Sequence, residues 1–269
     1  MHKENTTPAK NDDQKIREVL KNVKNRLLVF SGKGGVGKST VAANLAMALS
    51  EKGLKVGLLD VDIHGPNLVK MLGAEDRRVE MREEQIIPVN ITPNLKLVSM
   101  AFFLEKLDVP VVWRGPLKMK VIRQFIEDVA WGDLDWLICD SPPGTGDEPL
   151  SVASLIPATA AVIVTTPQEV SLLDSRKAVN FAHMLKLKIL GIIENMSGFV
   201  CPHCGEKTDL FKSGGGEVIA REYNIPFLGR IPIDPHIVES GDMGQPFVHY
   251  RKESEAAKAF AQIVEKIIK

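Results

Sequence analysis

The sequence has no long apolar run and no excess of charge of either sign. No apolar stretch in its 269 residues is long enough to cross a bilayer, and residues 1–24 lack the apolar core of a signal peptide. Lysine plus arginine equals aspartate plus glutamate at 34 each, so no bulk positive charge attracts nucleic acid. These absences predict a cytoplasmic protein that binds neither a membrane nor a nucleic acid.

Cysteine is also scarce, with Cys139, Cys201 and Cys204 as its three occurrences. A secreted disulfide scaffold carries more cysteines in a shorter chain, so that class is excluded. Apolar residues make up 44% of the sequence, which is enough to build a large buried core.

From Arg26 onward, short apolar runs alternate with helical stretches. The runs expected to be strands are 27–30, 56–59, 95–99, 136–139, 160–164, 189–193 and 227–231, and the expected helices are 39–52, 118–129, 171–185, 216–223 and 254–269. Most of the strands are continuously apolar, as is typical of parallel strands covered on both faces. The alternation predicts an α/β fold with a doubly wound, mostly parallel sheet flanked by helices.

This fold is expected to form a single domain over residues 26–269. Residues 1–25 are expected to be a flexible tail running into a short helix at 14–23. The last helix places Ala257, Phe260, Ala261, Val264 and Ile268 on one face. That face predicts docking onto the core, and the alternative of a membrane-binding tail is disfavoured by the mixed charge of the opposite face.

A glycine-rich loop follows the first expected strand directly. Its residues are Gly32, Lys33, Gly34, Gly35, Val36, Gly37, Lys38, Ser39 and Thr40. Glycines allow backbone N–H groups to converge on phosphate oxygens. Lys38 supplies positive charge to the β- and γ-phosphates, and Ser39 offers its hydroxyl to Mg²⁺. The spacing, between a strand and a helix, predicts a P-loop that binds Mg-ATP.

A dinucleotide-binding loop is the competing interpretation. Gly32, Gly34 and Gly37 also fit the spacing G-x-G-x-x-G, and Asp60 lies about 20 residues further on. Lys38 argues against it, because a lysine in the first turn of a helix opposes the helix dipole unless a polyphosphate lies there.

Two further apolar strands are followed by aspartates. The run 136–139 ends at Asp140, which is the Walker B pattern of a residue that holds Mg²⁺, usually through water. The run 56–59 is followed by Asp60 and Asp62, and both are expected at the same edge of the sheet. The Pro- and Gly-rich segment 141–148 after Asp140 predicts a partly hinged loop beside the phosphates.

The sequence Cys201-Pro-His-Cys204-Gly205 forms a tight C-x-x-C knuckle. Three interpretations compete: metal or iron–sulfur ligation, a redox dithiol, and inert thiols. A redox dithiol favours a helix directly after the pair, and none is indicated here. Inert thiols favour an apolar segment, and this one is polar, so ligation is the favoured interpretation.

Counting ligands then constrains the assembly. A [4Fe–4S] cluster or a structural Zn²⁺ site needs four ligands, and Cys201 and Cys204 supply two. His203 lies inside the turn, and Cys139 is expected in the core. Two chains related by a two-fold axis would supply four thiolates, which predicts a homodimer with a shared metal centre.

The segment Lys33-Gly-Gly-Val-Gly-Lys38 resembles the deviant Walker A motif of the MinD, ParA and nitrogenase-iron-protein superfamily. The resemblance implies that Lys33 acts on the partner's nucleotide across a dimer, although a solvated surface lysine is the plain alternative. It also implies that Asp62 orients the attacking water, that Asp60 supports the Mg²⁺ shell, and that Asn195 contacts the purine. Pro232 and Asp234 fall where the superfamily's other adenine-side loop lies.

Together, the motifs at 33–40, 60–66, 140–147, 201–205 and 211–217 resemble the Mrp/ApbC family of ATP-dependent iron–sulfur cluster carriers. The resemblance implies slow ATP hydrolysis, a [4Fe–4S] cluster on Cys201 and Cys204 at a homodimer interface, and apo iron–sulfur proteins as recipients. Some relatives carry a four-cysteine N-terminal segment or a small extra domain. Residues 1–25 contain no cysteine, so a minimal carrier is expected.

Other functions remain open at this point. A MinD- or ParA-like positioning ATPase shares the loop but has no use for the cysteine pair. A zinc-stabilised dimeric nucleotide switch, a metal chaperone and a reductase-like electron donor would all use the same thiols, because Zn²⁺ and iron–sulfur clusters accept the same four ligands.

Overall fold

The computed structural model describes residues 9–62, 65–103, 115–201 and 204–269. Its elements, in chain order, are α1 (Ala9–Val19), β1 (Val23–Ser31), α2 (Lys38–Glu51), β2 (Val56–Asp60), α3 (Leu68–Met71), β3 (Glu80–Arg82), β4 (Gln85–Ile87), β5 (Val89–Thr92), β6 (Leu95–Ser99), the 3₁₀ turn η1 (Met100–Phe103), α4 (Gly115–Glu127), β7 (Leu134–Asp140), α5 (Asp147–Leu155), β8 (Ala160–Thr165), α6 (Glu169–Met184), β9 (Ile189–Glu194), β10 (Phe199–Val200), β11 (Lys207–Thr208), α7 (Gly215–Glu222), β12 (Phe227–Arg230), α8 (Pro235–Asp242), α9 (Phe247–Tyr250) and α10 (Glu255–Ile267).

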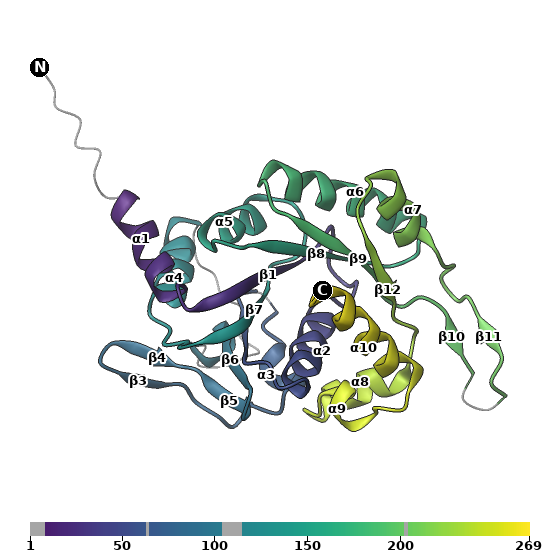
Figure 1. Cartoon of the computed structure of the whole chain (residues 1–269), viewed down its shortest axis with the longest axis horizontal. Helices are drawn as coiled ribbons and strands as arrows, with labels where there is room; N and C mark the ends of the chain where they lie inside the picture. Colours follow the sequence, from purple (N-terminus) through teal and green to yellow (C-terminus); the bar gives the residue numbers. More distant parts are fainter. Residues whose placement is uncertain (1–8, 63–64, 104–114, 202–203) are drawn as a thin grey trace, which may run out of the picture.

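The main sheet has eight strands in the order β12-β9-β8-β1-β7-β2-β6-β5 (Figure 1). Its strands pair in parallel except for β5, which runs antiparallel to β6 at the edge. The expected α/β class with a mostly parallel sheet is therefore confirmed, and all seven expected strands are present. β1 lies at the centre, so the loop after it opens at the carboxyl edge of the sheet, where ligands bind in such folds.

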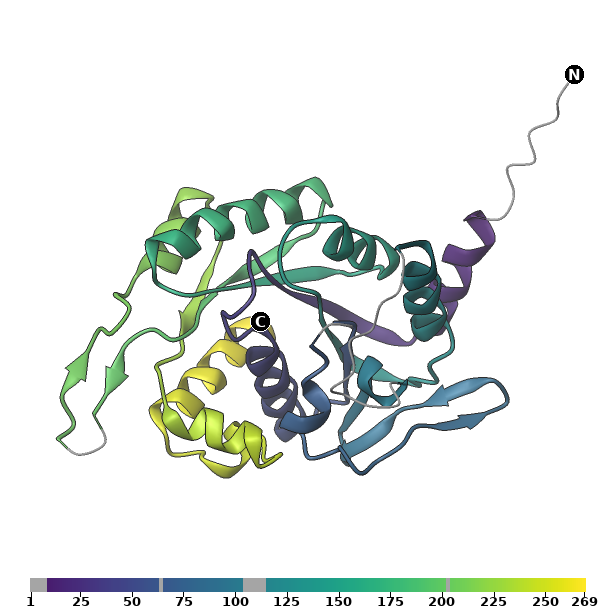
Figure 2. The ribbon, with the colours of Figure 1, turned by 180° about the vertical axis from the view of Figure 1, so that it is seen from behind.

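Helices cover both faces of this sheet. One face carries α2, α3, α8, α9 and α10, and the other carries α1, α4, α5, α6 and α7 (Figures 1 and 2). Strand β1 shows why its sequence is continuously apolar: Leu27 and Val29 pack under α2, whereas Leu28 and Phe30 pack on the opposite side. Phe30 meets Phe181 of α6 edge-on, with ring centroids 5.5 Å apart.

The ends of the chain differ from the sequence expectation in detail. α1 begins at Ala9 and ends at Val19, so the expected helix at 14–23 was placed too late, and Val23 already belongs to β1. Ile16 of α1 and Leu20, just after the helix, are buried in the core.

α10 docks against α2 as expected. Ala261 and Ile268, however, are exposed, and the buried face uses Ile263 and Ile267 instead. Over the described residues, none of the helices has the length and apolar composition needed to cross a membrane.

A two-stranded arm projects from this body. β10 and β11 pair antiparallel, with Phe199 opposite Thr208 and Val200 opposite Lys207. Both views show the arm extending beyond α7 and β12, away from the main sheet. The sequence did not predict these strands, because each has two residues and no apolar periodicity.

Candidate functional site

The glycine-rich loop joins β1 to α2 at the carboxyl edge of the sheet. Gly37 is the N-terminal cap residue of α2 and has φ 79°, and Gly35 has φ 78°, in the left-handed region that favours glycine. A side chain at Gly37 would put its Cβ 2.3 Å from Nδ2 of Asn195, and one at Gly32 would collide with the backbone of Asp174 in α6. The loop is therefore held closely by neighbouring elements, as a preformed phosphate cradle requires.

Lys38 begins α2 and turns into the protein. Its Nζ lies 2.6 Å from Oδ1 of Asp140, the last residue of β7, and both side chains are buried. Nζ also lies 3.4 Å from Oγ of Ser39. The predicted phosphate-binding lysine and the predicted magnesium-binding carboxylate are thus brought together at the loop.

Two polar atoms beside this ion pair have no hydrogen-bond partner among the described residues: Oδ2 of Asp140 and Oγ of Ser31. Buried polar atoms are ordinarily satisfied, so these two indicate that a polar ligand belongs here. Oδ2 of Asp140 and the hydroxyl of Ser39 are hard oxygen donors of the kind that Mg²⁺ prefers, so the residues present fit a magnesium ion with nucleotide phosphates.

The two other aspartates occupy different places. Asp62 lines the small pocket in front of the loop, and its Oδ1 accepts a hydrogen bond from the backbone N–H of Gly65. Asp60 is fully buried behind it, where its carboxylate accepts from Oγ of Ser99 at 2.9 Å and from the backbone N–H of Asp62 at 3.2 Å. Asp62 can therefore meet a ligand directly, whereas Asp60 positions Asp62 from beneath.

Burial gives these carboxylates unusual protonation behaviour. Desolvation raises the pKa of Asp60 well above its ordinary value, and the neighbouring charge of Asp140 raises it further. Burial also raises the pKa of Asp140, while the positive charge of Lys38 acts in the opposite direction. A divalent cation would relieve the repulsion between the two carboxylates, which again fits the expected site.

The pocket in front of the loop has a volume of about 240 Å³. Its lining comprises Ser31, Gly34, Gly35, Gly37, Lys38, Ser39, Thr40, Asp62, Gly65, Asn67, Met71 and Pro143. Pro143 comes from the Pro- and Gly-rich segment 141–148 after β7, so that segment lies beside the phosphate loop, as the sequence predicts. Lys33 is half-buried, and its side chain makes no ion pair with any residue that the structure describes.

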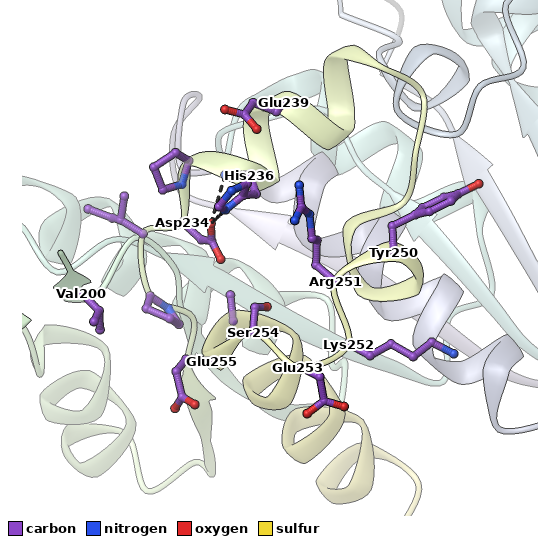
Figure 3. Close-up of a pocket in the computed structure, with 14 residues that line it drawn as sticks. Val200, Asp234, His236, Glu239, Tyr250, Arg251, Lys252, Glu253, Ser254 and Glu255 are labelled. Atoms are coloured by element: carbon purple, nitrogen blue, oxygen red, sulfur yellow. Dashed lines mark hydrogen bonds and ion pairs between the residues drawn. The ribbon is translucent and has the colours of Figure 1, made fainter. Parts of the chain in front are cut away.

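The expected base-side residues divide into two groups. Asn195 follows β9, and its Nδ2 donates a 2.9 Å hydrogen bond to the carbonyl of Val36 in the phosphate loop. Pro232 and Asp234 instead line a separate pocket of about 760 Å³ with His236, Arg251 and other residues (Figure 3). The carboxylate of Asp234 caps α8 by accepting from the backbone N–H of His236 at 3.0 Å. The structure thus places Asn195 at the loop, whereas Pro232 and Asp234 line a different pocket.

Cys201 and Cys204 lie at the end of the arm, in the turn between β10 and β11. Cys201 is half-buried and Cys204 is exposed. The turn is closed by hydrogen bonds from Gly205 N–H to the Cys201 carbonyl and from Cys201 N–H to the Glu206 carbonyl, each 2.9 Å long. Gly205 has φ 73°, which explains the glycine after the second cysteine. Cys139, by contrast, is fully buried in β7, as the sequence predicts.

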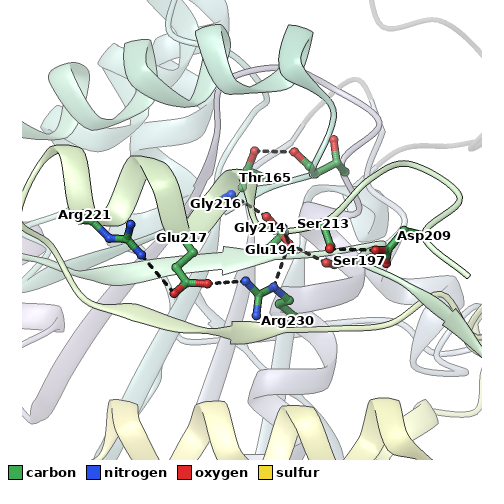
Figure 4. A network of polar contacts seen from close by, with 11 residues as sticks. Thr165, Glu194, Ser197, Asp209, Ser213, Gly214, Gly216, Glu217, Arg221 and Arg230 are labelled. Atoms are coloured by element: carbon green, nitrogen blue, oxygen red, sulfur yellow. Dashed lines mark hydrogen bonds and ion pairs between the residues drawn. The ribbon is translucent and has the colours of Figure 1, made fainter. Parts of the chain in front are cut away.

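Sequence reasoning missed one part of the site. Glu194, the last residue of β9, is completely buried. Its carboxylate accepts hydrogen bonds at both ends of residues 197–214, called the arm segment here because they carry the arm. It also accepts from Gly216 of α7 and Arg230 of β12 (Figure 4). A charged residue ending the apolar run 189–193 was the available signal, since a carboxylate is rarely buried without partners.

Comparison with known proteins gives a consistent result. Residues 22–268 match the model of the ParA family described as NUBPL iron-transfer P-loop NTPase. The chain is 49% identical over 257 residues to the iron-sulfur cluster carrier protein of Methanocaldococcus jannaschii, covering 95% of this chain and 88% of that one. It is 48% identical to the cytosolic Fe-S cluster assembly factor CFD1 of Kluyveromyces lactis, covering 93% of each.

Among solved structures, a nucleotide-binding protein of Archaeoglobus fulgidus in complex with ADP superposes with a TM-score of 0.80 at 40% identity. The match covers 92% of this chain and 96% of that one.

Proposed function

This chain belongs to the ParA family of NUBPL iron-transfer P-loop NTPases, and we propose that it carries an iron–sulfur cluster on Cys201 and Cys204 and transfers it to apo-proteins under the control of ATP. The observation that carries the proposal is the placement of the three cysteines. Cys139 is sealed in the core, whereas Cys201 and Cys204 are presented on an arm outside it. The position of the pair suits a cargo that must be received and handed over.

The cargo we propose is a [4Fe–4S] cluster, with Zn²⁺ as an alternative occupant of the same thiolates. Such a cluster takes four ligands. Over the described residues, no group of three or more His, Cys, Asp or Glu side chains could hold a metal within one chain. We therefore propose a homodimer in which the arms of two copies meet and each contributes Cys201 and Cys204. The recipients are apo iron–sulfur proteins, by analogy with the carriers that the chain resembles.

The enzymatic activity we propose is slow hydrolysis of ATP at the phosphate loop. Backbone N–H groups from Gly32 to Gly37, together with Ser39 and Thr40, bind the phosphates, and Lys38 exchanges Asp140 for phosphate oxygens. Magnesium would be held by Ser39 and Asp140, with Asp60 behind them, and would neutralise phosphate charge when bound. Asp62, which lines the pocket, orients the attacking water. We propose that Lys33 contacts the nucleotide bound by the partner subunit and stabilises its negative charge.

We propose three residues for the base side of the nucleotide site. Asn195 is the residue beside the loop and is proposed to contact the purine. We also propose that Pro232 and Asp234, which follow β12, form part of the base side of the site. On the same grounds of family membership, we propose that the protein works in the cytosol, as the name of the Kluyveromyces lactis relative states for that protein, without nucleic acid or membrane.

A transfer assay tests this function. The protein is loaded anaerobically with iron and sulfide and mixed with an apo-protein whose activity needs a [4Fe–4S] cluster. We expect activation by the wild type and none by the double variant Cys201→Ser/Cys204→Ser, which should still bind Mg-ADP. Cys139→Ala is the matched control, and it should load and transfer normally. Transfer by the double variant would refute the ligand assignment.

A further inference from the structure

Glu194 and Asn195 are consecutive residues at the end of β9, yet they hold two different parts of the molecule. Asn195 bonds to Val36 in the phosphate loop. Glu194 faces the other way and bonds to the segment that carries Cys201 and Cys204 (Figure 4). The end of β9 is therefore the physical connection between the two sites.

The carboxylate of Glu194 fixes both ends of the arm segment. At the entry, Oγ of Ser197 donates to Oε1 at 2.5 Å, and at the exit the backbone N–H of Gly214 donates to the same oxygen at 2.9 Å. The N–H of Gly216, in the first turn of α7, donates to Oε2 at 2.5 Å. Since Gly214 offers no side chain to cap α7, Glu194 provides the cap from the neighbouring strand.

The glycine run at 214–216 fits this arrangement. A Cβ on Gly216 would lie 3.1 Å from Cβ of Glu194 and 3.2 Å from its Oε2, and one on Gly215 would lie 2.6 Å from Leu172. Gly214 has φ 91° and Gly198, at the other end of the arm segment, has φ 80°. The backbone thus approaches the buried carboxylate closely from both ends, with a left-handed glycine at each.

The negative charge of Glu194 is balanced locally. Nε of Arg230, in β12, lies 3.3 Å from Oε1, and the guanidinium also pairs with Glu217 of α7. Glu217 is partly exposed and pairs with Arg221 as well. Hence Glu217 shares Arg230 with Glu194 but bonds to neither end of the arm segment, which makes it a matched control.

We propose that Glu194 is a positioning residue that couples the phosphate loop to the cysteine arm: nucleotide bound at the loop fixes Asn195, and Glu194 transmits that constraint to both ends of the arm segment. The proposal rests on the proposed function, because it assigns a regulatory route to the same two sites. Gly37 packs against the Asn195 amide, so any change in the loop acts directly on the residue beside Glu194.

The test is alkylation of Cys201 by iodoacetamide, followed by peptide mass spectrometry, with and without Mg-ADP on the full-length protein. Cys201 is half-buried, so we expect its rate of alkylation to depend on how firmly the arm is held. In the wild type we expect Mg-ADP to slow the reaction by about five-fold, a coupling in the usual range. In Glu194→Gln the ratio of the two rates should fall to about one, while the affinity for Mg-ADP stays near the wild-type value.

Glu217→Gln makes the same chemical change on the same arginine and should keep the wild-type ratio. If Glu194→Gln does not fold, as thermal melting would show, Ser197→Ala removes one arm bond while keeping the carboxylate, and it should reduce the ratio partially. If Glu194 had a purely structural role, the Glu194→Gln variant would show higher alkylation rates both with and without Mg-ADP and an unchanged ratio. That result would overturn the proposal. Loss of the ratio in Glu217→Gln as well would also overturn it.

The alkylation experiment, combined with the cluster loading and transfer assay, separates this inference from the proposed function. A wild type that loads no cluster but shows the nucleotide-dependent rate would refute the carrier and keep the coupling. If the wild type loads and transfers a cluster but its Cys201 alkylation rate is the same with and without Mg-ADP, the coupling is refuted and the carrier function stands.

Discussion

The Nζ atom of Lys38 lies 2.6 Å from Oδ1 of Asp140, although the two residues are 102 positions apart in the chain. The ion pair is buried and adjoins a second buried carboxylate, that of Asp60. Lys38 therefore pairs with the buried carboxylate of Asp140 and also faces the phosphate pocket, so removing its side chain should affect both stability and nucleotide binding.

Lys38→Ala should abolish binding of Mg-ADP and also destabilise the protein. Removing one partner of a buried ion pair costs about 3–5 kcal/mol of the free energy of unfolding, because the remaining charge is left uncompensated. Lys33→Ala, in the same loop, is the control and should change the free energy of unfolding by less than about 0.5 kcal/mol. Calorimetric titration and urea denaturation measure the two effects, and unchanged Mg-ADP binding by Lys38→Ala would contradict the site.

Gly37→Ala and Gly35→Ala form a second matched pair. Both residues have φ near 78°, so alanine is strained at each by about 1 kcal/mol. A Cβ at Gly35 meets nothing within 4 Å, whereas one at Gly37 would collide with the Asn195 amide and break its hydrogen bond to Val36. Urea denaturation without nucleotide should therefore show the larger loss for Gly37→Ala. Equal losses of the free energy of unfolding in the two variants would mean that the Asn195 side chain moves aside without cost, which would contradict the prediction.

Binding of Mg-ADP should release protons. Burial, followed by the charge of Asp140, raises the pKa of Asp60 well above its ordinary value of 3.8, so this carboxyl stays protonated at pH values where a free aspartate is ionised. Mg²⁺ favours the ionised form, and the affinity should therefore increase as the pH rises through that pKa. Without nucleotide, the free energy of unfolding should instead decrease as the pH rises. The raised pKa of this acid means that the folded state binds the proton more tightly than the unfolded state, and that stabilisation is lost at higher pH.

Calorimetry in two buffers of different ionisation enthalpy measures the proton release directly. Asp60→Asn is the control, since it cannot release a proton at this position. Identical heats for the wild type in both buffers, over about pH 5 to 8, would contradict the prediction.

Thiol labelling should distinguish the three cysteines. Burial raises the pKa of the Cys139 thiol, which keeps it protonated and out of reach of reagents in the folded protein. An excess of thiol reagent should therefore modify Cys201 and Cys204 in the native state and Cys139 only after denaturation. Peptide mass spectrometry checks the assignment, and rapid native labelling of Cys139 would show that β7 is less protected than its burial indicates.

The sheet could be predicted from the sequence because its strands are continuously apolar and each is followed by a helix or a turn signal. β3, β4, β5, β10 and β11 could not, since they have between two and four residues and few buried positions, and their pairing depends on partners rather than on local pattern. The helix at the N-terminus was misplaced because Val23 reads equally well as the end of a helix and the start of a strand.

The phosphate loop and its carboxylates were also predictable, because their spacing is local and their chemistry is narrow. The role of Glu194 was not, since three of its four donors lie 20, 22 and 36 positions further along the chain, and only folding brings them together. The sequence also did not show that the Asp234 carboxylate caps α8.

The most direct test of the account is anaerobic reconstitution with iron and sulfide, followed by metal and sulfide analysis together with native mass spectrometry. The account predicts a dimer that contains about four irons and four sulfides per two chains, and a Cys201→Ser/Cys204→Ser variant that contains none. A colourless monomer that still hydrolyses ATP would contradict it and leave a nucleotide switch without cargo.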